Sequence, residues 1–169
     1  IVRSVGRKGL SQLPSSKRKQ ISSSLLLDDD EHYRFVTLRL QVHAKFTDEM
    51  LKNVYQAQVV RDETMAASAS RALRDKAKKD IVVVICGSAH CAYGLGIPQR
   101  VQRRLPGTVE RIVTMSESGD LVLSKAMKAH ARKVTTTHGQ LRFLTKPMAD
   151  FHHFVFPAPK KEAGLSDKE

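Results

Sequence analysis

The fold is decided by the stretch Ile81-Val82-Val83-Val84-Ile85-Cys86-Gly87-Ser88-Ala89-His90-Cys91-Ala92-Tyr93-Gly94-Leu95-Gly96-Ile97-Pro98. Its first five residues are all apolar, which predicts a central strand that is covered on both faces. A glycine-rich turn follows, and Pro98 suits the first turn of a helix. Ligands of open α/β sheets bind beyond the carboxyl ends of the strands. The stretch therefore predicts that His90 and Tyr93 lie at the ligand-binding edge of such a sheet.

The rest of the chain alternates between helical and strand patterns. Residues 47–79 predict a long helix, which begins with Thr47 as its N-cap and two acidic residues in its first turn. Further helices are expected over 99–104 and 125–133, and strands over 109–115, 141–144 and 151–156. Residues 28–43 favour a helix, although the alternation in 35–38 leaves a strand open. This order predicts an α/β fold, a mainly parallel sheet flanked by helices.

The charge of the chain is strongly basic, +12 with an isoelectric point near 10.0. Residues 1–27 hold six basic residues and no acid, which predicts a basic N-terminal arm or linker. An α/β domain over 28–156 and a polar tail over 157–169 complete the expected organisation. The charge is consistent with contact with nucleic acid or an anionic membrane surface, but a basic organellar or solvated surface is the preferred interpretation, since no RNA-binding, zinc-finger or helix-turn-helix motif is present. No apolar run approaches the roughly 18 residues of a membrane span.

Two separated motifs carry a resemblance to a known family. The segment 57–66, Ala-Gln-Val-Val-Arg-Asp-Glu-Thr-Met-Ala, and the later Gly-Ser-Ala-His with Tyr-Gly-Leu-Gly-Ile-Pro resemble the ChaN-like family, the haem-binding uptake branch of the Tiki superfamily. Looser similarity lies at 10–21, and 149–156 resembles the strand that closes these domains. The matches span about residues 45–156, so the chain looks like the C-terminal portion of such a domain. The family's Gly-Glu-x-His motif has no counterpart here.

The resemblance implies haem as a cofactor and makes His90 and Tyr93 the candidate ligands. Histidine is a common metal ligand, and a tyrosinate can ligate haem iron. In the Tiki superfamily the matching Gly-x-x-His belongs to a proposed metal-dependent hydrolase site, so His90 is also the candidate metal ligand. The alternative for both residues is structural, with side chains that pack and hydrogen-bond within the loop. Gly87, Gly94 and Gly96 are expected to adopt positive φ or allow close backbone approach around a ligand.

Asp62 and Glu63 form a pair of carboxylates on the predicted long helix. Neighbouring residues of a helix point about 100° apart, so at most one of the two faces a cleft. Glu63 is predicted to face the cleft beside His90, and Asp62 to form a structural salt bridge. Both carboxylates could instead be structural or solvated.

Cys86 and Cys91 are the two cysteines of the chain, and they are too few for a structural zinc site. Free thiols in a reducing compartment are expected.

We expect a ChaN-like ligand-binding domain, haem-binding and non-catalytic. Two alternatives remain: a degenerate domain that serves as a structural subunit of a large organellar assembly, or a Tiki-type hydrolase using His90 and Glu63. The absence of an initiating Met suggests a processed or truncated product. An organelle, the mitochondrion or chloroplast, is the favoured location. We also expect a partner, either another protein or the chain's own N-terminal half.

Overall fold

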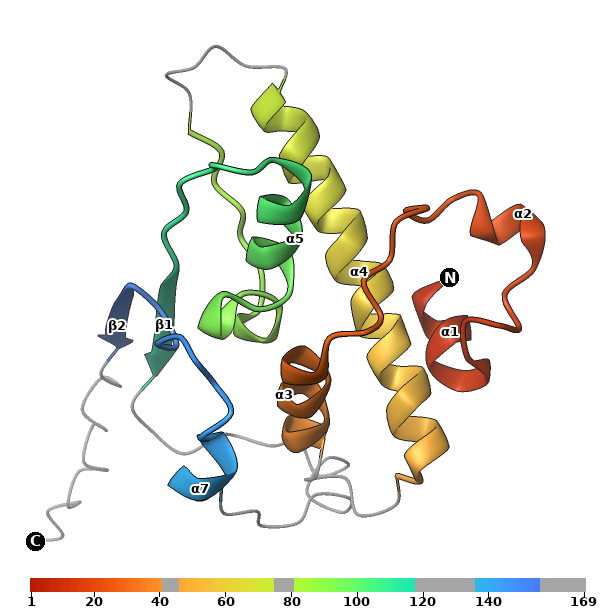
Figure 1. The fold of residues 1–169 in the computed structure, drawn as a ribbon, viewed down its shortest axis with the longest axis horizontal. Helices are drawn as coiled ribbons and strands as arrows, with labels where there is room; N and C mark the ends of the chain where they lie inside the picture. Colours follow the sequence, from red (N-terminus) through yellow and green to blue (C-terminus); the bar gives the residue numbers. More distant parts are fainter. Residues whose placement is uncertain (41–45, 75–80, 118–135, 156–169) are drawn as a thin grey trace, which may run out of the picture.

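A long helix is the axis of the molecule. The computed structural model describes residues 1–40, 46–74, 81–117 and 136–155. The helix α4, Asp48–Arg74, runs through the fold, and helices α1, α3 and α5 pack along its sides (Figure 1). Its start is as predicted, because the Thr47 hydroxyl accepts a hydrogen bond from the Met50 amide at 3.3 Å. None of the described helices is long and apolar enough to cross a membrane.

The N-terminal residues pack against α4 and do not form the predicted arm. Helix α1, Val2–Lys8, lies on α4, and the short helix α2, Ser15–Arg18, follows it (Figure 1). Val5 is fully buried, and Leu10 and Leu13 are nearly so. They form one core cluster with Ala57 and Val60 of α4. The prediction of an arm was wrong. The segment has few apolar residues, but Val5, Leu10 and Leu13 pack together against α4.

Helix α3, Asp30–Leu40, covers another part of α4 and builds the second core cluster. Phe35 and Val36 of α3 meet Tyr55 and Val59 of α4 and the loop residue Leu95. The helix predicted over 28–43 is therefore confirmed for the described residues, and the strand alternative is wrong.

The loop after residue 86 forms two turns before it enters a helix. It contains the 3₁₀ turns η1, Ser88–His90, and η2, Ala92–Gly94, followed by α5, Ile97–Arg104. Pro98 lies in the first turn of α5, as predicted. Ile97 and Val101 pack against Ala66 and Ala69, whose small side chains let α5 approach α4 closely. This packing brings the loop onto the middle of α4.

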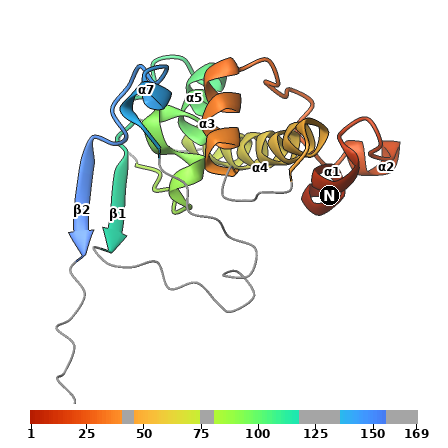
Figure 2. The same cartoon turned by 90° about the horizontal axis from the view of Figure 1, so that it is seen from below.

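A small parallel sheet lies at the end of the molecule opposite α1 and α2 (Figure 2). Strand β1, Val113–Glu117, pairs with β2, Phe151–Val155, with Val113 opposite Phe151. The parallel direction and the last strand are confirmed. The strand predicted over 141–144 is wrong, because Thr137 and Gln140 form a capping box that starts the helix α7, His138–Leu141. The helix predicted over 125–133 and the tail over 157–169 lie outside the described residues.

The central strand predicted over 81–86 is not formed. The segment is without regular structure and pairs with neither β1 nor β2. It is also not covered: Ile81 is 85%, Val83 79% and Ile85 95% exposed. Five apolar residues predict a strand only where neighbouring strands supply hydrogen bonds and cover both faces. Among the described residues no strand pairs with this segment.

Candidate functional site

One buried carboxylate of α4 joins two histidines that are far apart in the sequence. The Asp62 side chain is fully buried, and its Oδ1 lies 2.5 Å from Nδ1 of His90 in η1. Its other oxygen, Oδ2, lies 3.4 Å from Nε2 of His32 in α3. Asp62 therefore connects three separate elements at one point. This cluster is the candidate site.

The His90 ring is held so that one nitrogen stays available. Its Nδ1 donates to Asp62, and its side chain keeps 13% of its surface exposed. No hydrogen-bond partner for Nε2 occurs within the described part of the chain. The Gln58 amide nitrogen lies 2.8 Å from the same Nδ1 and 3.4 Å from Asp62 Oδ1. Because Nδ1 has one proton and the carboxylate is the closer, charged acceptor, Asp62 fixes the tautomer that presents a lone pair on Nε2.

His32 is a neutral, buried partner of the same carboxylate. Burial, and next the Arg100 guanidinium, lower the pKa of His32 from 6.5 to about 4. Its Nδ1 lies 3.3 Å from Nη2 of Arg100, so the neutral ring accepts there. Its Nε2 lies 3.4 Å from Asp62 Oδ2 without forming a hydrogen bond. Burial raises the pKa of Asp62, and the His90 contact opposes that shift. The cluster thus holds one carboxylate between a buried neutral imidazole and the partly exposed ring of His90.

Glu63 belongs to a separate ion cluster and does not lie beside His90. Its carboxylate is fully buried and accepts a hydrogen bond from Arg103 at 2.7 Å. It also forms ion pairs with Arg104 at 2.5 Å and with the Arg100 Nε at 3.3 Å. It also accepts the Leu26 amide at 2.8 Å. These contacts hold the segment before α3 against α4 and α5. The two carboxylates do diverge as predicted, but Asp62, not Glu63, is the one that faces His90.

Tyr93 is placed by its backbone as much as by its ring. It is the non-glycine residue with positive φ, 61°, in the described part of the chain. Its amide donates to the Met148 carbonyl at 2.9 Å, and its half-buried ring meets the Phe35 ring edge-on, with centroids 5.4 Å apart. A left-handed conformation in a bulky residue is uncommon and costs free energy. The ring contact is a packing role, and the role of Tyr93 as an iron ligand stays a prediction.

Two of the three loop glycines are required by the backbone. Gly96 has φ of +71°, and a Cβ there would lie 2.5 Å from the His90 carbonyl oxygen and 3.3 Å from Asp62 Oδ2. Gly94 has φ of +70°, with Lys146 atoms from 3.0 Å. Gly87 has an ordinary φ of −68° and room for a Cβ, so the expectation is wrong there. Gly96 is what lets the loop close over Asp62 and His90.

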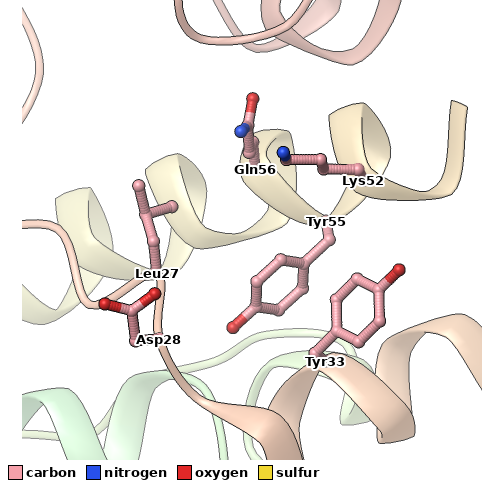
Figure 3. Close-up of a pocket in the computed structure, with 6 residues that line it drawn as sticks. All are labelled: Leu27, Asp28, Tyr33, Lys52, Tyr55 and Gln56. Carbon is pink, nitrogen blue, oxygen red and sulfur yellow. The ribbon is translucent and has the colours of Figure 1, made fainter. Parts of the chain in front are cut away.

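A pocket of the structure lies next to the site and not in it. A half-open pocket of about 350 Å³ is lined by Leu27, Asp28, Tyr33, Lys52, Tyr55 and Gln56 (Figure 3). Tyr55 forms part of its wall and meets the His32 ring edge-on, with centroids 5.4 Å apart. Burial raises the pKa of the Tyr55 hydroxyl, which donates to the Asp29 carbonyl at 3.3 Å. His90 and Tyr93 do not line this pocket.

The described residues do not form a multi-ligand metal centre. No group of three or more histidine, cysteine, aspartate or glutamate side chains in this part of the chain is arranged to hold a metal ion. Asp62 and His90 are already bonded directly to each other. Direct metal binding by His90 therefore stays a prediction, with no set of companion ligands to support it.

A comparison with protein families decides what kind of domain this is. The model of the haem-binding uptake family, Tiki superfamily, ChaN, matches residues 1–101. The chain belongs to the ChaN family. The match runs from α1 into α5, so it includes His32, Asp62 and His90 of this ChaN domain, while β1 and β2 lie beyond it. No curated protein and no solved structure matches the chain.

Sequence reasoning missed two members of the site in this ChaN domain, His32 and Arg100. Arg103 and Arg104 lie three and four residues after Arg100, so both are neighbours of Arg100 on the helix surface. Such a face, if buried, requires a carboxylate, and Glu63 was the available one. His32 carried no comparable signal, because it follows an acidic run that indicates only a helix start.

Proposed function

We propose that this ChaN-family domain binds haem and that Nε2 of His90 is the axial ligand of the iron. The observation that carries the proposal is the 2.5 Å contact between His90 Nδ1 and the fully buried Asp62 carboxylate. Histidines that ligate metals donate their other ring proton to such an acceptor, which orients the ring and raises its basicity. Haem supplies an iron with an axial position that an imidazole nitrogen can fill.

The surroundings of His90 also suit a large apolar ligand. The exposed residues Ile81, Val83 and Ile85 lead directly into the turn that carries His90. An exposed apolar surface of this kind marks a place where something apolar binds. Tyr93 lies three residues further along, with its ring half-buried, and completes the candidate haem-binding loop.

A haem titration of the whole chain tests the proposal. We expect a saturable shift of the Soret band with one haem per chain, and the shift is lost in His90→Ala. The matched control is His138→Ala, which removes an exposed histidine of α7 and leaves the shift unchanged. Tyr93→Phe separates the two candidate ligands, because it retains the ring packing and removes the hydroxyl. An unshifted spectrum in the unmutated chain, or equal loss in both histidine variants, contradicts the proposal.

A second function, as a structural subunit of a larger assembly, is favoured by a different observation. Seven apolar residues of the run at 81–85 and of the two strands are more than half exposed: Ile81, Val83, Ile85, Val113, Met115, Phe151 and Phe154. Val84 is 43% exposed, and Val82 is partly buried. Two-stranded sheets are marginally stable alone, and parallel sheets are ordinarily covered on both faces. We infer that a β-strand of another polypeptide pairs with residues 81–85, because a strand satisfies the free backbone groups and the apolar side chains together.

The state of the isolated chain tests the second function. We expect residues 1–169 alone to self-associate at micromolar concentration, and Val83→Lys to reduce this, since a charge on an exposed strand edge blocks pairing. Light scattering after size exclusion gives the mass. A monomer at all concentrations, with one cooperative thermal transition, would rule out the subunit function. Haem binding by that monomer would leave the first proposal intact.

A further inference from the structure

Three arginines of α5 surround a single carboxylate of α4. The nearest nitrogens of Arg100, Arg103 and Arg104 lie 3.3, 2.7 and 2.5 Å from the oxygens of Glu63. No other carboxylate in the described part of the chain forms an ion pair with any of the three. The group therefore holds an excess of positive charge. Arg100 is fully buried and the Arg104 side chain is 13% exposed, so salt screens this excess less than it screens charges on an open surface.

The serine-rich segment between α2 and α3 crosses α4 and lies beside these arginines (Figure 1). The Ser22 hydroxyl oxygen accepts a hydrogen bond from Arg104 Nη2 at 3.1 Å and another from the Ser24 amide at 3.3 Å. The Ser24 carbonyl accepts from Arg103 Nη2 at 3.2 Å and from Arg104 Nη2 at 3.4 Å. Ser22 is thus the serine of residues 22–24 whose hydroxyl group contacts a guanidinium.

The guanidinium groups have further donors at this place. Arg103 uses Nη2 for its contacts with Glu63 and Ser24, and its Nε and Nη1 bond no group among the described residues. The Arg103 side chain is also 32% exposed, so these donors are within reach of an added group. A guanidinium presents five N–H donors in a planar arrangement that suits the oxygens of a phosphate. A phosphoryl group on Ser22 can therefore be bound while the contacts with Glu63 remain.

The chain before Ser22 is basic and accessible. Lys17, Arg18 and Lys19 stand five, four and three residues before it, and all three are exposed. Ser22 is partly buried and follows the four-residue helix α2, outside any regular structure. Protein kinases select substrates partly by their pattern of charges, and a helix of one turn opens at little cost because it is marginally stable. The segment therefore suits a serine kinase that selects basic residues upstream of its target.

We propose that Ser22 is a phosphorylation site and that Arg103 and Arg104 bind its phosphoryl group. The donor is ATP. The catalytic base of the kinase accepts the proton of the Ser22 hydroxyl, and Oγ forms a bond to the γ-phosphorus while the bond from that phosphorus to the bridging oxygen breaks and ADP leaves. The Ser24 carbonyl loses the Ser22 hydroxyl as a donor, at 3.2 Å, but retains both arginines.

The modification fastens the segment before α3 more firmly to α5. A phosphoserine carries about two negative charges and three acceptor oxygens, so it balances the excess positive charge of the arginines. The same segment is already attached at Leu26, whose amide donates to Glu63 at 2.8 Å and whose carbonyl accepts from Arg100 at 3.2 Å. The phosphate adds a second attachment four residues earlier. It therefore stabilises the packing of α3 through the segment that leads into it.

The first experiment treats the whole chain with ATP, Mg²⁺ and a purified serine kinase that selects upstream basic residues. We expect the intact mass to rise by about 80 Da, the mass of one phosphoryl group. Peptide mapping should locate it at Ser22, and Ser22→Ala should abolish it. Ser23→Ala is the matched control, because it removes the neighbouring serine and should leave the modification unchanged. Phosphate at other serines with none at Ser22, or no phosphate at all, would overturn the site.

The second experiment measures thermal unfolding with phosphoserine introduced at position 22 during translation, so it does not depend on the kinase. We expect Tm to rise by about 3 °C or more, the effect of one charge-assisted hydrogen bond in a chain of this size. In Arg103→Gln the same modification should give a smaller rise. Arg111→Gln is the matched control, because its side chain is 64% exposed and is bonded to Asp150 instead.

The comparison of each protein with its own unmodified form removes any effect of the substitution on stability. An equal rise in Arg103→Gln and in the unmutated chain would overturn the binding of the phosphate by the arginines. A fall in Tm on modification would also overturn it, because it would show that the phosphate displaces the arginines from Glu63. Neither experiment involves haem, so both results are independent of the proposed function.

Discussion

Gly96 lies so close to His90 that a methyl group at its Cβ position would be 2.5 Å from the His90 carbonyl oxygen. The same position would be 3.3 Å from Asp62 Oδ2. The absence of a side chain at Gly96 therefore allows His90 and Asp62 to come into contact. Because φ of Gly96 is +71° with ψ of −119°, glycine is also the residue that adopts this backbone without strain.

Gly96→Ala is expected to destabilise the domain by about 2–3 kcal/mol, since backbone strain and a steric clash add. Urea denaturation measures the change. Gly107→Ala is the matched control, because Gly107 also has positive φ, +86°, but has nothing within 4 Å of its Cβ position. It should cost about 1 kcal/mol, from the left-handed backbone alone. Gly87→Ala should change stability by less than about 0.5 kcal/mol. Equal losses at Gly96 and Gly107 would contradict the close approach to His90.

Glu63→Gln is expected to destabilise the domain by about 3–5 kcal/mol, because it leaves buried guanidinium groups without their carboxylate. Arg100 is as fully buried as Glu63, whereas the Arg103 side chain is 32% exposed. Arg103→Gln should therefore cost far less. The free energy of unfolding in denaturant is the measurement. A loss on Glu63→Gln no larger than that of the arginine variant would show that the cluster is not buried in solution.

Stability is expected to fall as the pH is lowered from 7.5 to 5.5, by about 1 kcal/mol from His32. The pKa of His32 is lowered to about 4 in the folded chain from its ordinary value of 6.5. As the pH falls, the unfolded chain therefore binds a proton at His32 before the folded chain does. The free energy of unfolding is unaffected by His32 above pH 6.5 and decreases between pH 6.5 and about 4. The raised pKa of Asp62 acts with the opposite sign at lower pH, since the folded state then binds its proton more strongly.

The variant His32→Gln isolates this pH effect. It retains hydrogen-bonding groups near Asp62 and Arg100 but has no ring that titrates. Unfolding in urea at several pH values between 5.5 and 7.5 should give a flatter profile for the variant than for the unmutated chain. Parallel profiles would show that His32 is not the group responsible.

Asp62→Asn is expected to weaken haem binding by about 10–100-fold, while leaving His90 in place. An amide oxygen accepts a hydrogen bond from Nδ1 less strongly than a carboxylate does, so the ring is oriented less firmly. Gln58→Ala is the comparison, because Gln58 contacts the same nitrogen at 2.8 Å but is uncharged. Haem titrations with all three proteins give the ratio. Equal affinity for Asp62→Asn and the unmutated chain would remove the carboxylate from the mechanism of binding.

The sequence by itself determined the elements whose signals are local. Thr47 with its acidic first turn starts α4, Pro98 starts α5, and the small residues Ala66 and Ala69 allow the two helices to approach. Caps, prolines and small side chains act over a few residues, so their effects can be predicted from the chain alone. The motif at 57–66 and the turn after residue 86 also identified the family that the comparison confirmed.

Only the tertiary structure decided which carboxylate faces His90 and what completes the site. Two adjacent helical residues diverge by about 100°, but the direction of each depends on how α3 and α5 pack. His32 reaches Asp62 because α3 lies over α4, and Arg100 reaches Glu63 because α5 does. The segment 81–85 also depends on its neighbours, because its local sequence predicts a strand that the structure does not form. Its residues have every local property of a buried strand, yet a strand exists only where a neighbouring strand pairs with it.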